Sequence, residues 1–228
     1  MFENLIFKNQ GEREQFEKYK RVKGVYLHKQ VYDILLEANG AQTVTYYELS
    51  SLIRYDKNLR DKLYIYLATA EEYLRALICE SYDISPDHKA IKKYSPEVAD
   101  SIEKKEDSEL SNLYFALELD FSALMELCAK KRLISIDENA RKKIKELRNS
   151  TMHHAFLLFG KAKRLSALND YFESLERKIN VLIKLLPEEY REGFVSDIRR
   201  LNGYPDRQYL KKFYLEVEDG SGEVRIKR

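Results

Sequence analysis

Four long stretches of this chain carry apolar residues at alternating three- and four-residue steps, and this spacing constrains the fold most. Residues at such steps line one face of an α-helix, so each stretch predicts a helix with one buried side. Only eight glycines and four prolines interrupt the 228 residues, which favours long helices over a many-stranded β fold. The stripes span 59–77, 110–128, 136–158 and 165–186.

Capping residues predict where several of these helices begin. Thr45 is followed three residues later by Glu48, a capping box that predicts the start of a short helix. Asp56 is expected to cap the next helix. Asp137 lies near the start of the third stripe. We expect that helix to continue until Gly160 ends or bends it.

The C-terminal part of the chain has a different pattern. Pro187 stops the fourth stripe, and a shorter helix follows. Apolar and polar residues then alternate over 213–217 and 223–226, on either side of the sequence DGSG at 219–222. Alternation around such a turn predicts a β-hairpin.

The helices and the hairpin together predict the architecture. Short links between long amphipathic helices indicate an antiparallel helical bundle. We therefore expect an all-α fold, an antiparallel bundle with a small C-terminal β-hairpin. The expected parts are an N-terminal helical segment (1–44), the bundle (45–186) and a C-terminal helix with the hairpin (187–228).

Composition excludes several classes of protein. Apolar residues make up 44% and charged residues 34% of the chain, which is typical of a globular protein. The net charge is only +2, so a nucleic-acid contact requires a local basic patch. The sequence lacks a secretory signal pattern and any run of about 18 apolar residues, so we expect a cytoplasmic protein without a membrane span. Cys79 and Cys128 are expected to be reduced, buried thiols.

The heptapeptide RNSTMHH at 148–154 is the segment richest in reactive groups. It places Arg148, Asn149, His153 and His154 within one predicted helix, in a chain with four histidines. Arginine grips phosphate oxygens through a planar fork, and histidine exchanges protons near neutral pH. Cleavage of a phosphodiester requires both functions. Other motifs for metals, cofactors or phosphate loops are absent from the sequence, so we expect neither a metal nor a cofactor.

Helical phase separates the members of this motif. Arg148 and His153 are five positions apart, which is about 140° around a helix. Asn149 and His153 are four apart and share a face, so the amide could orient the imidazole. His154 follows the apolar stripe and is expected to face the core rather than a substrate. A symmetric dimer would bring two arginines and two histidines into one cleft. Ribose supplies its own 2′-hydroxyl nucleophile, which favours RNA as the substrate.

Two further groups of residues have both a structural and a functional interpretation. Glu71 and Arg75 are four apart beside the first apolar stripe. They form either a surface ion pair or a half-buried pair that positions the motif helix. Basic residues flank the motif and form either a solvated face or a patch for RNA phosphates. These are Lys142, Lys143, Lys145, Lys161, Lys163 and Arg164.

These residues resemble the HEPN ribonuclease superfamily, whose signature is an arginine followed after four to six residues by a histidine. Within it, the chain is similar to the AbiD/AbiF-like abortive-infection proteins. The first matching segment is ELSSLIRYDKNLR at 48–60, continuing to Glu71 and Arg75. The second is LRN at 147–149, followed by His153 and His154. The family often continues with Arg-Leu-Trp-Asn, whereas this chain has AFLLF at 155–159.

The resemblance implies an all-α bundle that forms a homodimer around the motif. It further implies a metal-independent endoribonuclease that acts in phage defence or as a toxin, with an RNA or protein antitoxin as a further partner. Arg148 would bind the phosphate, His153 would transfer protons and Asn149 would orient His153. Glu71 and Arg75 match the family's polar pair and would support the site. Two alternatives remain: a noncatalytic RNA-binding or adaptor protein with a HEPN fold, and a purely structural helical dimer.

Overall fold

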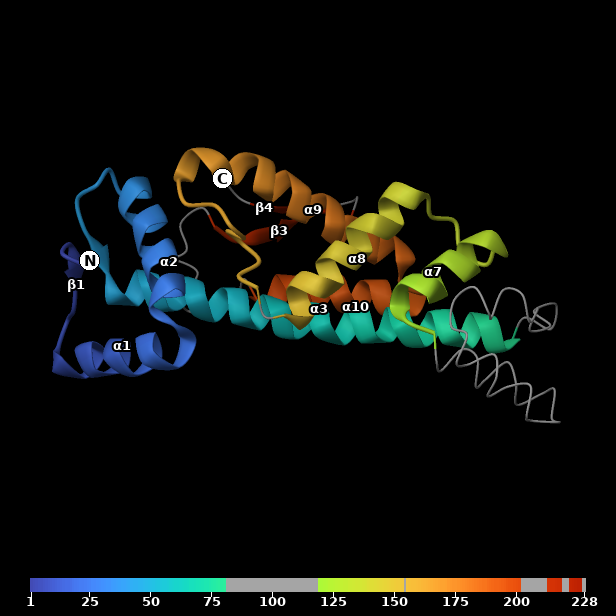
Figure 1. Ribbon diagram of the computed structural model, residues 1–228, viewed down its shortest axis with the longest axis horizontal. Coiled ribbons are helices and arrows are strands. Elements are labelled where there is room, and N and C mark those ends of the chain that lie inside the picture. The colour runs from blue at the N-terminus through green and yellow to red at the C-terminus, as the bar shows by residue number, and fades with distance from the viewer. Residues whose placement is uncertain (81–118, 154, 202–212, 219–221, 227–228) are drawn as a thin grey trace.

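One helix of 35 residues, α3 (Tyr46–Glu80), runs along most of the molecule (Figure 1). The computed structural model describes residues 1–80, 119–153, 155–201, 213–218 and 222–226. The predicted capping box starts α3: the Thr45 hydroxyl accepts from the backbone N–H of Glu48 at 3.2 Å, and the Glu48 carboxylate accepts from the backbone N–H of Thr45 at 2.8 Å. The predicted break at Asp56 is wrong, because α3 continues through it and buries its side chain.

Three helices pack on or near the C-terminal half of α3. They are α7 (Phe121–Lys130), α8 (Glu138–Met152) and α9 (Leu168–Leu185), the last preceded by a short 3₁₀ turn over Leu165–Ala167. Asp120 and Asp137 cap α7 and α8 by accepting from backbone N–H groups three residues ahead. The fourth apolar stripe is buried along α9 as predicted. The part of the second stripe at 110–118 lies outside the described residues.

The hairpin is formed by β3 (Leu215–Val217) and β4 (Val224–Ile226), paired antiparallel as predicted. It follows α10 (Glu188–Leu201) and packs against α9 and α10. Two polar side chains of α9 fix β4. The Glu176 carboxylate accepts from the N–H of Ile226 at 2.7 Å, and the Asn180 side chain both donates to and accepts from the backbone of Val224. These bonds satisfy backbone groups that a two-stranded sheet would otherwise leave unpaired.

The N-terminal segment covers the other end of α3 (Figure 1). It contains α1 (Gln10–Lys23) and α2 (Val25–Ala38), joined by Gly24 alone. A short parallel pair, β1 (Leu5–Ile6) with β2 (Val44–Thr45), ties the first residues to the start of α3. The sequence pattern did not predict this pair, since two-residue strands carry almost no periodicity.

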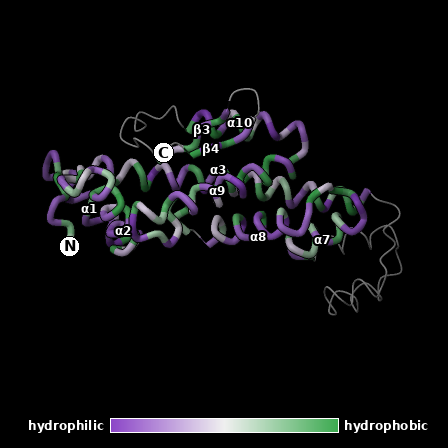
Figure 2. Tube along the Cα trace, turned by 90° about the horizontal axis from the view of Figure 1, so that it is seen from above, coloured by the Kyte–Doolittle hydropathy of each residue, from purple (hydrophilic) through white to green (hydrophobic). Residues whose placement is uncertain are grey.

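The buried apolar side chains of all these elements form one core cluster. Apolar and polar residues alternate along the helices in Figure 2, as expected for helices with one buried face. Both cysteines are free thiols: Cys128 is buried, whereas Cys79 is only half-buried. None of the helices in the described ranges is both long enough and apolar enough to cross a lipid bilayer.

Candidate active site around Arg148

Helix α8 positions the motif through its buried face. Ile144, Leu147 and Thr151 are buried and hold the helix to the core. The Thr151 hydroxyl donates to the carbonyl of Leu147 at 2.8 Å, which satisfies it inside the helix. Arg148 follows Leu147 directly and therefore lies at the edge of this buried face. Its side chain keeps 33% of its surface exposed.

The helix ends earlier than predicted, at Met152, and His153 is its C-cap residue. The backbone N–H of His153 donates to the carbonyl of Asn149 at 3.0 Å, and that of Ala155 donates to Ser150 at 2.9 Å. The expected continuation to Gly160 is therefore wrong. The side chain of His153 is exposed at this helix end. His154, expected to face the core, lies outside the described residues.

The guanidinium of Arg148 forms an ion pair with Glu71 of α3. Its Nη2 lies 3.4 Å from Oε2 of Glu71, while Oε1 of the same carboxylate accepts from Arg75 at 2.7 Å. Glu71 is largely buried, with 19% of its side chain exposed. The structure thus brings Glu71, Arg75 and Arg148 together, and the pair lies half-buried against the motif helix. Both arginines thus contact the same carboxylate, one through each of its oxygens.

Other contacts restrict the orientation of Arg148. Its guanidinium carbon lies 5.5 Å from the centre of the Phe121 ring on α7, a cation–π distance. Its Nε is buried, and the part of the chain that the structure describes provides no acceptor for it. A guanidinium held by one carboxylate and one ring is pre-oriented, so less side-chain entropy is lost when it binds an anion.

Asn149 and His153 lie one helical turn apart at the end of α8, and both side chains are exposed. The hydrogen bond that joins these two residues is the backbone bond described above. The predicted orientation of the imidazole by the amide stays a prediction. His153 is five residues beyond Arg148, and its backbone φ of −85° keeps its side chain close to the helical direction. The two side chains therefore leave α8 about 140° apart.

Asp56 fixes the segment that follows the motif, a role that the sequence interpretation missed. Its Oδ1 accepts from the backbone N–H of Leu157 at 2.7 Å and of Leu158 at 3.0 Å. Its other oxygen lies 3.0 Å from Nε of Arg60. Burial raises the pKa of Asp56 to about 6, although these N–H groups and Arg60 oppose the shift. The carboxylate thus anchors the chain four residues after His153.

The signal for a buried Asp56 was present in the sequence. Leu52, Leu59 and Leu63 are buried on α3 at the helical steps that also include position 56. A carboxylate in phase with this stripe faces the core, where it requires partners. The capping interpretation competed with this one because aspartate is also a preferred cap.

The basic residues around the motif belong to different elements. Lys142 and Lys145 are exposed and Lys143 is half-exposed on the first half of α8. Lys161, Lys163 and Arg164 are exposed in the loop before α9. Gln30 of α2 holds that loop by donating to the carbonyls of Gly160 and Ala162. The two groups therefore flank the motif from opposite ends of α8, and a role in RNA binding stays a prediction.

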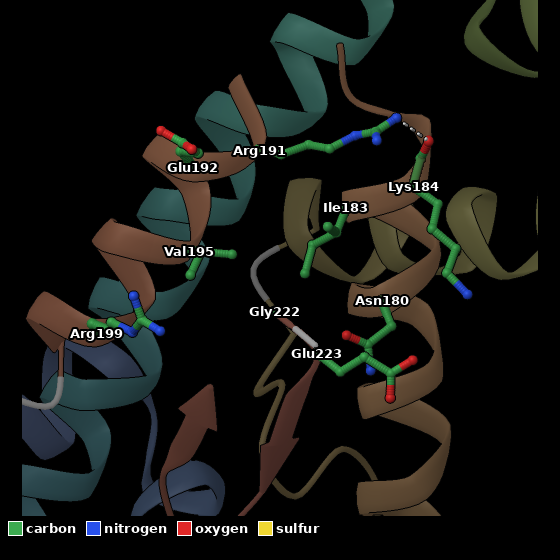
Figure 3. A pocket seen from close by; sticks show the side chains of 9 residues that line it. All are labelled: Asn180, Ile183, Lys184, Arg191, Glu192, Val195, Arg199, Gly222 and Glu223. Carbon is green, nitrogen blue, oxygen red and sulfur yellow. Dashed lines mark hydrogen bonds between the residues drawn. The ribbon is translucent and has the colours of Figure 1, made fainter. Parts of the chain in front are cut away.

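A cavity of about 610 Å³ lies apart from the motif, between α9, α10 and the residues before β4 (Figure 3). Two of its lining residues make structural contacts. Arg191 donates to the carbonyls of Leu186 and Lys184 and so satisfies the C-terminal end of α9. Asn180 fixes β4 as described above. We assign this cavity to the packing of the C-terminal elements.

Neither a cluster of metal ligands in the described residues nor a match to a known protein indicates the function of this chain. Across the described ranges, no group of three or more His, Cys, Asp or Glu residues could hold a metal ion. His28 is buried, and His88 lies outside those ranges. Comparisons with protein-family models, with curated proteins and with solved structures give no match. The function must therefore be inferred from the side chains and their geometry.

Proposed function

We propose that this protein is a metal-independent endoribonuclease of the HEPN type, with its active site at a homodimer interface. The observation that carries the proposal is the arrangement of Arg148, which is held by Glu71 yet a third exposed. It lies on the same short helix as the exposed Asn149 and His153. A fixed cation and an accessible imidazole provide the two functions that cleavage requires, phosphate binding and proton transfer.

The angle between Arg148 and His153 favours a site built from two chains. Side chains about 140° apart on α8 do not converge on one phosphate within a single chain. A two-fold axis beside the end of α8 places a second copy of this surface opposite the first. Arg148 of one copy then faces the same cleft as His153 of the other.

The proposed reaction uses the 2′-hydroxyl of the RNA as nucleophile. The 2′-oxygen attacks the adjacent phosphorus, its proton is transferred to a base, and the bond from phosphorus to the 5′-oxygen breaks. The leaving 5′-oxygen takes up a proton, so the products end in a 2′,3′-cyclic phosphate and a 5′-hydroxyl. His153 serves as acid or base, Arg148 stabilises the charge on the phosphate, and Asn149 orients His153. Glu71 and Arg75 position Arg148.

The biological role follows from the resemblance to abortive-infection proteins. We propose that the ribonuclease acts in the cytoplasm in phage defence or as a toxin, restrained by an RNA or protein antitoxin. Lys142, Lys143 and Lys145 on one side and Lys161, Lys163 and Arg164 on the other would contact RNA phosphates. Such contacts make RNA affinity fall as salt rises.

The test is cleavage of a labelled RNA by the purified protein in excess chelator. We expect scission by the wild type and its loss in Arg148→Ala and in His153→Ala. Arg141→Ala is the matched control, because Arg141 lies two turns earlier on α8 and outside the Arg148–Glu71 ion pair. Equal cleavage by all three variants would exclude the assigned residues.

The second candidate is a noncatalytic RNA-binding or adaptor protein with a HEPN fold. It is favoured by the segment after the motif, since Phe156, Leu157, Leu158 and Phe159 are buried and so unable to contact substrate. The low net charge of +2 agrees with it. This candidate predicts salt-dependent binding of a structured RNA without strand scission. A purely structural dimer would neither bind nor cut RNA.

A further inference from the structure

A second cavity lies where the corner between α1 and α2 meets the start of α3. Its volume is about 510 Å³, within the range of about 300–1,000 Å³ typical of small-molecule sites. Gly24 forms the corner with a φ of 92°, a conformation that side chains other than glycine rarely adopt. This single-residue link places the last turn of α1 and the first turn of α2 on adjacent walls of the cavity.

One wall of the cavity is cationic. Lys23, Arg54 and Lys57 line it, and its lining contains no carboxylate. Burial, together with the nearby charges of Lys57 and Arg60, lowers the pKa of Lys23, as expected where cations are crowded. Lys57 pairs with Asp61, which lies outside the lining, at 3.7 Å, and Asp56 is buried beside Arg60. The charges of these two acids oppose the shift in the pKa of Lys23 without reversing it. An anion in the cavity would relieve this repulsion.

The other walls are aromatic and apolar. Tyr19, Tyr46 and His28 line the cavity. Phe16 makes edge-on ring contacts with His28 and Tyr46, at centroid distances of 5.8 and 6.1 Å. His28 is neutral near pH 7, because burial lowers its pKa. Its Nδ1 donates to the carbonyl of Gly24 at 3.0 Å, so its Nε2 is an acceptor. These walls suit a flat ring that carries donor groups.

We propose that this cavity binds a small molecule in which a phosphate group is attached to an aromatic or heteroaromatic ring. Lys23, Arg54 and Lys57 hold the phosphate by charge-assisted hydrogen bonds. Tyr19 and Tyr46 contact the ring, and His28 accepts from one of its donors. A free nucleotide and the 5′-phosphorylated end of an RNA share this chemistry. The volume fits a single nucleotide unit.

The site is separate from the Arg148 surface. Arg54 and Glu71 are 17 positions apart on the same helix, which corresponds to about 25 Å. The cavity is therefore distinct from the proposed ribonuclease site, and ligand binding to it can be measured without RNA cleavage.

The experiment is equilibrium dialysis of the full chain against each of AMP, GMP, CMP and UMP as labelled probes. We expect at least one of them to bind once per chain. Lys23→Glu and Arg54→Glu, on different helices, should each weaken that binding by about tenfold or more. Arg21→Glu, also on α1 but outside the cavity lining, should leave it within about twofold. Circular dichroism verifies that each variant is folded.

Three further ligands test the two halves of the proposal. The nucleoside alone and pyrophosphate alone should each bind at least about tenfold more weakly than the nucleotide. A 5′-phosphorylated tetraribonucleotide should bind no more tightly than the nucleotide. The proposal is overturned if none of the four nucleotides binds, if Lys23→Glu binds as Arg21→Glu does, or if pyrophosphate matches the nucleotide. Tighter binding of the tetraribonucleotide would assign the cavity to an RNA end instead.

Discussion

Oδ1 of Asp56, in the first third of α3, lies 2.7 Å from the backbone nitrogen of Leu157, 101 residues later in the chain. This bond, with the one to Leu158, replaces the helical bonds that these N–H groups would make if α8 continued. Asp56 therefore explains why α8 ends at Met152 and why His153 lies at an exposed helix end.

Removal of the Asp56 carboxylate should destabilise the protein strongly. Asp56→Ala removes the acceptor of two buried N–H groups and the carboxylate that pairs with Arg60, and we expect the free energy of unfolding to fall by about 3 kcal/mol. Asp61→Ala is the control, because that exposed residue is one turn and a half away on the same helix; its effect should stay within about 0.5 kcal/mol. Urea unfolding measures both. Similar losses in the two variants would contradict the role of Asp56.

The raised pKa of Asp56 predicts a pH dependence of stability. The folded-state pKa is about 6, against 3.8 for an ordinary aspartate. Between these values the folded state binds more protons than the unfolded state, so this group's contribution to stability falls as pH rises from 4 to 6. A shift of this size corresponds to a cost on the order of 3 kcal/mol above pH 6.

The measurement compares the free energy of unfolding of wild type and Asp56→Asn from pH 4 to 7. The asparagine side chain of this variant cannot ionise, so the stability of the wild type relative to the variant should decrease with rising pH and level off above pH 6. A constant difference would mean that the pKa of Asp56 is not shifted, and a difference that grows with pH would mean that its pKa is lowered; either result would contradict the raised pKa.

The position of Arg148 should depend on Glu71 rather than on its neighbour Glu72. Glu71→Ala removes the carboxylate that lies between Arg75 and Arg148. We expect the free energy of unfolding to fall by about 1 kcal/mol and RNA cleavage to become at least about tenfold slower. Glu72 is exposed, so Glu72→Ala should change neither. Unfolding curves and initial cleavage rates report the two effects. Equal cleavage by both variants would show that Glu71 does not position Arg148.

Gly160 should tolerate no side chain. A Cβ there would lie 2.0 Å from the ring of Tyr171, and the φ of 52° is already unfavourable for other residues. Gly40 has a similar φ of 67° with open space around it, so Gly40→Ala isolates the cost of backbone strain, about 1 kcal/mol. In thermal unfolding, Gly160→Ala should lower the stability of the protein more than Gly40→Ala does. Equal decreases in stability would mean that the Tyr171 ring moves away without cost.

The local features of the fold could be predicted from the sequence. The capping box of Thr45 and Glu48, the cap at Asp137 and the hairpin strands each depend on residues a few positions apart. The end of α8 could not be predicted in this way. No glycine or proline marks it, and it depends on a carboxylate about a hundred residues earlier.

In the candidate site, too, contacts between residues close in sequence could be predicted and contacts between distant residues could not. Glu71 and Arg75 could be paired by their spacing, and the structure adds that Glu71 also holds Arg148, 77 residues away. Whether Arg148 and His153 act together depends on a second chain. The angle of about 140° between the two side chains indicates that a second copy is required. The sequence does not reveal which residues would meet across such an interface.

The most direct test of a composite active site mixes two inactive variants. Arg148→Ala and His153→Ala chains are co-expressed with different tags, and the mixed dimer is purified and incubated with RNA in excess chelator. Each variant alone should be inactive, whereas the mixed dimer retains one Arg148 and one His153 across the interface and should recover part of the wild-type rate. A mixed dimer as inactive as its parents, beside an active wild type, would contradict the shared site.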